Sequence, residues 1–150
     1  MRVVIQRVSK AEVKVDGTVK GSCDKGLLIL AGIEEADSEE DAAWLSGKIA
    51  NLRIFSDEQD KMNLSVKDVN GGMLVVSQFT LHASTQKGNR PSYILAARPE
   101  KALPLFNVFV SMLEKELGKP IATGEFGAHM EVSLVNDGPV TIIIDSKNKQ

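Results

Sequence analysis

The sequence predicts an α+β fold: a single domain over residues 1–150 with a curled, barrel-like, mostly antiparallel β-sheet and two main helices. About seven or eight short segments have the alternation or the apolar content of strands. Two segments have a helical period, so strands and helices do not alternate as they do in parallel α/β folds. So many strands in one small domain favour a sheet that curls on itself.

The composition limits the classes of protein to which the chain can belong. Its 150 residues are 43% hydrophobic and 25% charged, the balance of a globular protein with one core. A net charge of −2 argues against a protein whose main task is to grip a phosphate backbone. Cys23 is the only cysteine, no apolar run approaches the ~20 residues that span a bilayer, and the start does not resemble a signal peptide. We therefore expect a cytoplasmic protein.

The first part of the chain is predicted to be mainly strands. Residues 2–8 and 11–15 alternate as two strands, and Asp16-Gly17 predicts a tight hairpin into residues 18–20. Residues 27–31 are apolar throughout, which is typical of a strand buried on both faces. This strand is expected at the centre of the sheet.

Two helices are predicted from their period and from their end signals. Ser38 as N-cap, with Asp41 three residues later, predicts a helix over residues 39–52. A second helix is predicted over residues 100–117, where a glycine and a proline follow. Pro104 must lie in the first turn of this helix or kink it, because proline lacks the N–H that an interior position needs.

The remaining segments are predicted as short strands and loops. A strand at residues 53–55 precedes a polar hairpin or excursion over residues 56–70. Residues 73–81 are predicted to be a strand that becomes polar at its far end, where chemistry could sit, and a loop long enough to be functional follows over residues 82–92. The last two strands are expected at residues 130–135 and 140–144.

Gly138-Pro139 interrupts these last two apolar runs. Asn136-Asp137-Gly138 alone would make a hairpin turn, but Pro139 removes a ladder donor and leaves the carbonyls of Gly138 and Pro139 without an obvious strand partner. Those carbonyls could face a ligand. The alternative is a plain turn between two core strands.

Conventional catalytic motifs are missing from the sequence. It contains no Gly-x-Ser-x-Gly elbow, no phosphate-binding glycine loop with lysine and no Cys-x-x-Cys. His82 and His129 do not have the spacing of metal ligands, so neither a metal nor a cofactor is predicted. Ser77 and Thr80 could be nucleophiles, but His82 is the only nearby base, and the alternative is that they cap or edge a strand.

Two segments together resemble the two signature motifs of the D-aminoacyl-tRNA deacylases, formerly called D-tyrosyl-tRNA deacylases. They are Ser-Gln-Phe-Thr-Leu at residues 77–81 and Asn-Asp-Gly-Pro-Val-Thr at residues 136–141. The likeness extends over nearly the whole chain, since residues 1–8, 88–92 and 126–130 also match the family pattern.

The resemblance implies a homodimer of barrel-like subunits with an active site at each interface. It implies that the Gly138-Pro139 peptide is cis and reaches into the partner's pocket, beside the strand at residues 77–81. Arg7 would help to fix the orientation of this motif, although from the residues alone it could equally be an outward side chain. The implied catalytic residues are Ser77, Gln78, Phe79 and Thr80, and the implied substrate-binding residues are Gly138, Pro139, Met130 and Arg7.

The reaction implied by the resemblance is hydrolysis of the ester that joins a D-amino acid to the 3′-terminal adenosine of tRNA. Glycyl-tRNA, such as glycine mischarged on tRNA-Ala, is an expected substrate, and L-amino acids are expected to be excluded. Either Thr80 is a covalent nucleophile, or the N–H groups of Phe79 and Thr80 stabilise an oxyanion while the 2′-hydroxyl of the tRNA assists the water; we favour the second mechanism.

Two further expectations concern the partners of the chain. Lys87 and Arg90 could contact tRNA phosphates near the acceptor end, although exposed cations on a loop are often only solvated. A hypothesis of another class is a non-catalytic dimeric module that binds an amino acid or a peptide terminus through the Gly138 and Pro139 carbonyls.

Overall fold

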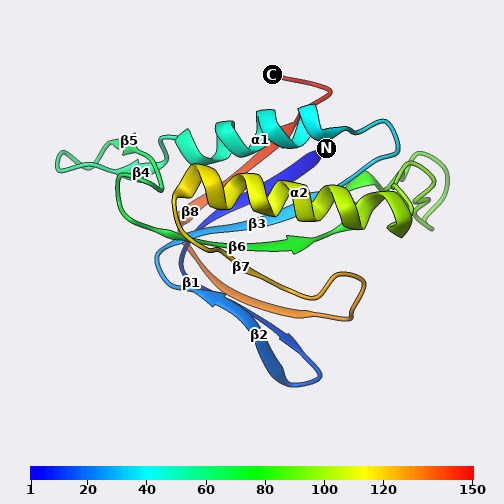
Figure 1. Ribbon diagram of the computed structural model, residues 1–150, viewed down its shortest axis with the longest axis horizontal. Helices are drawn as coiled ribbons and strands as arrows, with labels where there is room; N and C mark the ends of the chain where they lie inside the picture. Colours follow the sequence, from blue (N-terminus) through cyan, green and yellow to red (C-terminus); the bar gives the residue numbers. More distant parts are fainter.

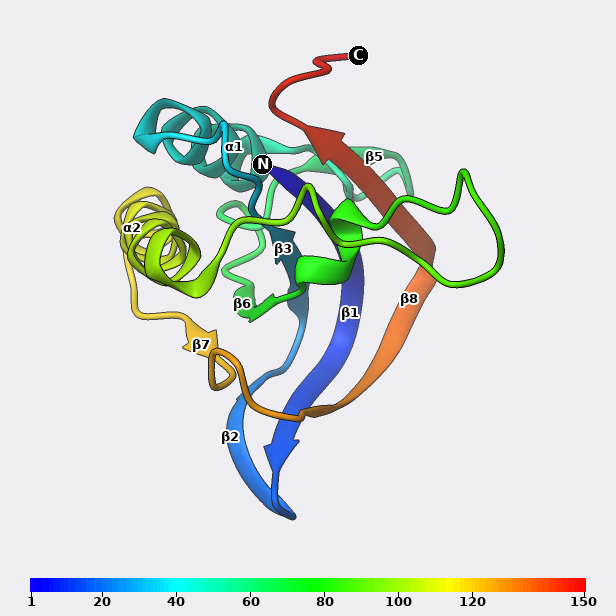
Figure 2. The same cartoon turned by 90° about the vertical axis from the view of Figure 1, so that its right-hand side faces the viewer.

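The computed structural model describes residues 1–150 and has one large mixed sheet with two helices on one of its faces (Figures 1 and 2). The strands of this sheet follow the order β2-β1-β3-β6-β7, and β8 pairs with β1. They are β1 (Arg2–Val15), β2 (Thr18–Cys23), β3 (Gly26–Gly32), β6 (Gly72–Ser77), β7 (Ala122–Thr123) and β8 (Glu131–Asp145). The helices are α1 (Glu39–Asn51) and α2 (Pro99–Leu117), and β4 (Phe55–Ser56) and β5 (Met62–Leu64) form a separate hairpin.

The predicted fold class is confirmed, and the pairing shows how the sheet curls. Strand β1 pairs antiparallel with β2, β3 and β8, whereas β3–β6 and β6–β7 are parallel. The first half of β1 lies beside β3 and its second half lies beside β2, while β8 follows β1 along most of its length. The sheet is therefore nearly closed; β1 and β8 are its two long, curved strands, and β8 lies at its edge (Figure 2).

Strand β3 is central and buried on both faces, as its unbroken apolar run predicts. Leu27 and Ile29 belong to the large core under the two helices, whereas Leu28 belongs to a second, smaller core on the opposite face. In the neighbouring β6, Val75 and Leu74 divide between the two cores in the same way. The second core exists because the curled halves of β1 and β8 cover the face of the sheet that the helices leave open.

Both helices begin and end within a residue or so of their predicted bounds. At the start of α1, the N–H of Ser38 donates to the Asp41 carboxylate at 2.9 Å, which completes a capping box. Pro104 is the sixth residue of α2, beyond its first turn, so the carbonyl of Glu100 loses a helical donor. Neither helix combines the length and the apolarity needed to cross a membrane.

The structure corrects several predicted strand boundaries: the strand predicted over residues 53–55 lies at Phe55–Ser56, and three further corrections concern the large sheet. Residues 2–8 and 11–15 are parts of one strand, β1, with irregular register at Val8 to Lys10. The strand predicted over residues 73–81 ends at Ser77, and the 3-10 helix η1 (Phe79–His82) follows it. The two last predicted strands are one strand, β8, so the plain turn between two core strands is excluded: both halves pair antiparallel with β1.

Candidate active site

Helix η1 begins where the ladder between β6 and β3 ends. Ser77 is the last paired residue of β6, opposite Ala31, and the N–H of Gln78 donates to the Ala31 carbonyl at 2.8 Å. Phe79 and Thr80 then form the first turn of a helix, where N–H groups have no intrahelical acceptor. This turn can therefore offer two adjacent backbone donors to an oxygen atom that gains negative charge.

The hydroxyl of Thr80 has no base beside it. Its Oγ1 accepts a hydrogen bond from the side-chain amide of Gln78. His82, the only nearby base in the sequence, is 3% exposed, and its Nδ1 lies 3.7 Å from a Glu34 carboxylate oxygen. The other nitrogen, Nε2, has no hydrogen-bond partner, so it accepts no hydrogen bond from Thr80. A serine or threonine nucleophile needs an adjacent base, and this arrangement does not supply one.

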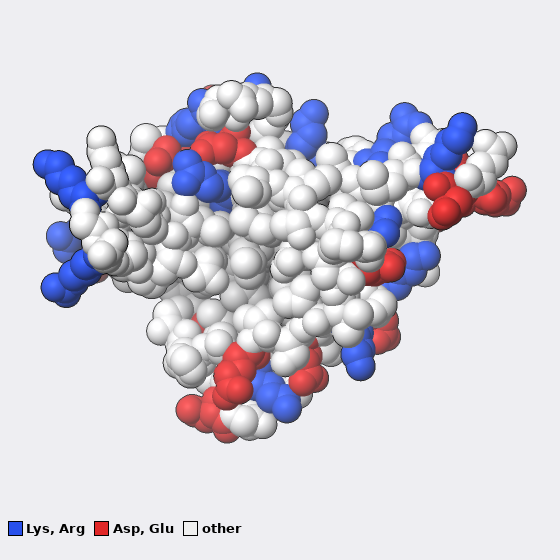
Figure 3. Space-filling model, turned by 180° about the vertical axis from the view of Figure 1, so that it is seen from behind, with Lys and Arg blue, Asp and Glu red and all other residues white.

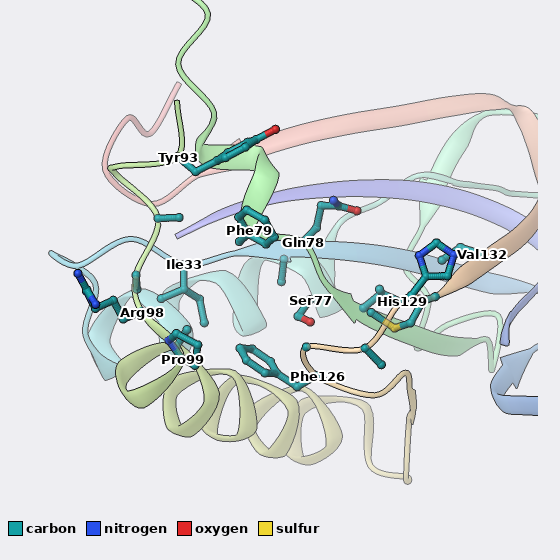
Figure 4. Close-up of a pocket in the computed structure, with 18 residues that line it drawn as sticks. Ile33, Ser77, Gln78, Phe79, Tyr93, Arg98, Pro99, Phe126, His129 and Val132 are labelled. Carbon is teal, nitrogen blue, oxygen red and sulfur yellow. The ribbon is translucent and has the colours of Figure 1, made fainter. Parts of the chain in front are cut away.

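A cleft of about 580 Å³ lies beside η1, and 12 of its 18 lining residues are hydrophobic (Figure 4). Phe79 and Gln78 form one wall with Tyr93, whose ring meets the Phe79 ring edge-on at 5.1 Å between centroids. Phe126 lies on the opposite side, and His129 stands at one end. The site is thus apolar, with few polar side chains that could do chemistry.

The predicted site residues separate into those that line this cleft and those that do not. Ser77, Gln78, Phe79 and Met130 line it, and Thr80 follows Phe79 in η1. The remaining predicted residues lie outside the cleft of their own chain; they are Arg7, Lys87, Arg90, Gly138 and Pro139. Lys87 and Arg90 are exposed on a loop whose base is closed by pairing between Ser84 and Ser92 (Figure 2).

The Gly138-Pro139 segment is an outward loop inserted into a continuous strand. Asn136 of β8 is opposite Val8 of β1, and Thr141 is opposite Gln6. That is five residue steps on β8 against two on β1, so β8 carries three extra residues. The Gly138-Pro139 peptide is cis, and both residues are exposed.

Asn136 closes the base of this loop. Its Oδ1 accepts a hydrogen bond from the N–H of Val140 at 2.8 Å, and its Nδ2 donates to Thr141 Oγ1 at 3.0 Å. The side chain thereby replaces the strand partners that the extra residues have lost. Sequence reasoning did not assign this role to Asn136, although the residue lies within the motif.

The side chain of Arg7, on the neighbouring strand β1, holds the Gly138-Pro139 loop through hydrogen bonds. Its Nε donates to the Asp137 carbonyl at 2.8 Å, and its Nη1 donates to the Ile54 carbonyl at 2.7 Å. Its side chain is only 11% exposed, and the Asp137 carboxylate lies 3.6 Å from Nε. Arg7 is therefore a half-buried side chain that joins two backbone segments, not an outward side chain on the first strand.

Several cleft residues carried no signal in the sequence. Arg98 is the only lysine or arginine of the lining and lies at the end of the cleft opposite His129 (Figure 4). Tyr93, Phe126 and Val132 also line the cleft. These residues come from segments far apart in the chain, and of them only Phe126 lies in a stretch, residues 126–130, that matches the family pattern.

Cys23 does not offer an alternative nucleophile. Burial, with a smaller contribution from the neighbouring Asp24 carboxylate, raises the pKa of this thiol to about 11. A thiol with this pKa is almost entirely protonated at neutral pH, and the thiolate is the reactive form. Cys23 also lies outside the cleft.

The face of the molecule opposite the helices has a broad central area without charged side chains (Figure 3). Charged residues gather at its margins. The most exposed apolar side chains include Ile94 at 85% and Leu95 at 56%, in the segment before α2, and Ile143 at 68%, in β8.

Comparison with known proteins identifies relatives over the whole chain. Residues 4–145 match the family described as D-Tyr-tRNA(Tyr) deacylase. Proteins named D-aminoacyl-tRNA deacylase from Flavobacterium psychrophilum and Flavobacterium johnsoniae are 65% and 63% identical over 150 residues, which is all of each chain.

Two solved structures have the same fold. One, named c-Myc DNA Unwinding Element Binding Protein, has a TM-score of 0.89 and 41% identity, with 97% of this chain and 98% of that chain covered. The other, described as a probable eukaryotic D-amino acid tRNA deacylase, has a TM-score of 0.81 and 16% identity, covers 95% and 97% of the two chains, and supports the fold alone. From the family match and the full-length relatives, we conclude that the chain belongs to the D-Tyr-tRNA(Tyr) deacylase family, whose named members are hydrolases.

Proposed function

We propose that the chain hydrolyses the ester bond of D-aminoacyl-tRNA and releases the free amino acid and the tRNA. The observation that carries this proposal is η1, which brings the N–H groups of Phe79 and Thr80 beside an apolar cleft that has no base paired with a nucleophile. An aminoacyl ester is already reactive, so positioning and stabilisation of its oxyanion supply much of the required catalysis.

In this mechanism the ester carbonyl oxygen binds at the first turn of η1. Water attacks the carbonyl carbon, and the 2′-hydroxyl of the terminal adenosine relays a proton: it accepts one from that water and passes its own to the ribose oxygen that leaves. The negative charge that develops on the carbonyl oxygen is stabilised by the Phe79 and Thr80 N–H groups. Collapse of the tetrahedral intermediate breaks the bond to the ribose oxygen, which takes up a proton. Gln78 holds the Thr80 hydroxyl, and Ser77 lies at the cleft wall.

The working enzyme is proposed to be a homodimer with its active sites at the interface. Gly138 and Pro139 are exposed and do not line the cleft of their own chain, although they lie on a loop that Arg7 and Asn136 hold in place. A well-supported loop that points outward is suited to contact a second subunit. The uncharged face opposite the helices offers a surface for that contact (Figure 3).

Chirality is proposed to be read by exclusion. If the Gly138 and Pro139 carbonyls of the partner crowd one side of the substrate's α-carbon, only hydrogen fits there, and an L-amino acid would press its Cβ against backbone. Each ~1.4 kcal/mol of such overlap is tenfold in rate. Glycine has hydrogen on both sides, so this geometry also admits glycyl-tRNA, including glycine mischarged on tRNA-Ala. The role is chirality proofreading during translation, in the cytoplasm.

Contacts with the tRNA are proposed to be few and close to its acceptor end. Lys87 and Arg90 are exposed and form no ion pair, so they are available to phosphates. A net charge of −2 does not favour an extensive grip on a nucleic-acid backbone. For the same reason we do not extend to this chain the DNA-binding role stated in the name of one similar structure.

The test is a side-by-side deacylation assay with D-tyrosyl-, L-tyrosyl- and glycyl-tRNA and no added metal. We expect release of D-tyrosine and glycine, with L-tyrosyl-tRNA spared. If D-tyrosyl-tRNA is hydrolysed but glycyl-tRNA is not, the side chain of the D-amino acid must make favourable contacts in the pocket. Binding of D-tyrosine without any turnover would support a non-catalytic amino-acid-binding module instead.

A further inference from the structure

The side chain of Arg2, at the start of β1, joins the end of β8 to the end of η1. Its Nη1 donates a hydrogen bond to the carbonyl of Leu81 at 2.7 Å. Its Nε and Nη2 both lie 3.0 Å from Oδ2 of Asp145. One guanidinium group therefore contacts a carboxylate and the backbone of the turn at the same time.

Helix η1 depends on contacts from outside for its orientation. It has four residues, too few for its own hydrogen bonds to fix it. At its entry, the Gln78 N–H donates to Ala31 of β3. At its exit, the Leu81 carbonyl is one of the last-turn acceptors that a helix leaves unsatisfied, and Arg2 supplies the donor.

Asp145 keeps the guanidinium in this orientation. Partial burial opposes ionisation of this carboxyl, but hydrogen bonds from the Lys147 N–H and from Arg2 lower its pKa below the ordinary value. Asp145 therefore remains a carboxylate at neutral pH. An arginine that contacts a carboxylate with two of its nitrogens has a defined plane, so its third nitrogen points in a fixed direction.

We infer that Arg2 is a positioning residue for the hydrolysis, because it fixes the peptide groups of Phe79 and Thr80 through the Leu81 carbonyl. This inference rests on the proposed function, in which those two peptide groups stabilise the oxyanion. Arg2 does not line the cleft, so it acts on the turn and not on the substrate. A shift of ~1 Å in catalytic geometry can cost ~10²-fold in rate.

The backbone of Arg2 is secured independently of its side chain. It pairs with Gly32 of β3 on one side and with Asp145 of β8 on the other. Loss of the guanidinium should therefore leave β1 in place while it releases the Leu81 carbonyl. This separation makes a side-chain substitution informative about catalysis.

The test compares Arg2→Met and Arg2→Lys with the unaltered protein in steady-state deacylation of D-tyrosyl-tRNA. We expect Arg2→Met to lower kcat by about tenfold to a hundredfold with KM within about twofold, because the loss is confined to the transition state. Lysine cannot contact Leu81 and Asp145 in the same geometry, so Arg2→Lys should restore only part of the rate. A third variant, Arg2→Ala, leaves space for a free guanidinium ion. Addition of that ion at a non-denaturing concentration should raise the kcat of this variant.

The matched control is Arg53→Met. Arg53 also donates from Nε to a backbone carbonyl, that of Asn63 at 3.0 Å, but it does so at the β4–β5 hairpin. Its substitution should leave kcat unchanged. If Arg2→Met fails to fold, Asp145→Asn is the second variant. It removes the carboxylate that holds the Arg2 guanidinium, so it should also lower kcat.

Three results would overturn the inference. One is a wild-type kcat in folded Arg2→Met or Asp145→Asn. Another is a raised KM with unchanged kcat, which would make Arg2 a tRNA contact. The third is an equal loss in Arg53→Met. An unaltered protein without turnover of D-tyrosyl-tRNA would overturn the proposed function itself, so the two failures are distinguishable.

Discussion

The turn at η1 and the loop at Gly138-Pro139 both interrupt strands of the same sheet, but they face different surroundings. Each is held through a backbone carbonyl by an arginine of β1: Arg2 contacts Leu81, and Arg7 contacts Asp137. The turn follows the end of a strand and borders the cleft of its own chain. The loop lies in the middle of a strand, is exposed and does not border the cleft of its own chain.

This difference suggests a division of work between the two segments. A turn beside a cleft can act on a substrate bound by the same subunit, so its backbone donors are suited to catalysis. A supported loop that points outward is suited to shape the pocket of another subunit. Catalysis is therefore expected to depend on the turn, and selection of the substrate on the loop.

The largest expected effect comes from the substrate. Replacement of the 2′-hydroxyl of the terminal adenosine by hydrogen should lower turnover by about 10²–10⁴-fold, because general acid–base assistance is worth about that much and the turn supplies no base. Binding should remain, as measured by competition with the normal substrate. Undiminished turnover would assign the proton transfer to a protein side chain.

The next effect tests the backbone donors. Phe79→Pro removes one N–H at the first position of η1, where proline is compatible with helix geometry, and should reduce kcat by about 10²–10³-fold. Phe79→Ala is the control, because it removes the ring and keeps the N–H. Equal rates for the two variants would show that the Phe79 amide does not contact the oxyanion.

A somewhat smaller effect is expected at the loop. Gly138 has φ of +139°, and a Cβ there would lie 3.0 Å from Arg7 Nη2 and 3.0 Å from the Val140 nitrogen. Gly138→Ala should therefore displace the loop and reduce activity about 10²-fold in a folded protein.

An experiment with mixed variants distinguishes an active site shared between two subunits from one formed within a single chain. A heterodimer of Gly138→Ala and Phe79→Pro subunits would contain one pocket with an intact turn and an intact partner loop. Activity should return when the two inactive proteins are mixed and allowed to exchange subunits. Failure to recover activity in a confirmed heterodimer would contradict the proposal that the loop serves the partner's cleft.

The smallest effect is expected at the Thr80 side chain. Thr80→Ala should retain its rate within several-fold, because its hydroxyl only accepts a bond from Gln78 and its N–H is unchanged. Loss of a covalent nucleophile would instead cost many orders of magnitude. A folded Thr80→Ala protein with a rate near background would therefore support covalent catalysis.

Local signals in the sequence were sufficient for much of the fold. Asp16 and Gly17 have positive φ values of 50° and 77°, as the predicted hairpin requires. Ser38 and Asp41 begin α1, and the apolar run at residues 27–31 marked the central strand. Each of these signals depends on neighbours in the chain.

The errors arose where a distant partner decides the structure. The strand before η1 stops at Ser77 because its partner β3 ends at Gly32, a limit that the local alternation does not contain. The two halves of β8 join because β1 runs past both. The cleft could not be predicted for the same reason: Arg98, Tyr93 and Phe126 meet only in the folded chain.

The register of β8 makes the loop a removable insert. If Asp137, Gly138 and Pro139 were excised, Asn136 would remain opposite Val8, and Val140 would come opposite Arg7. Side chains along the shortened strand would still alternate between the two cores. Val8 and Leu134 belong with the smaller core, whereas Val140 and Ile142 pack against the larger one. Three residues are thus all that separate an ordinary antiparallel strand from one that carries the loop.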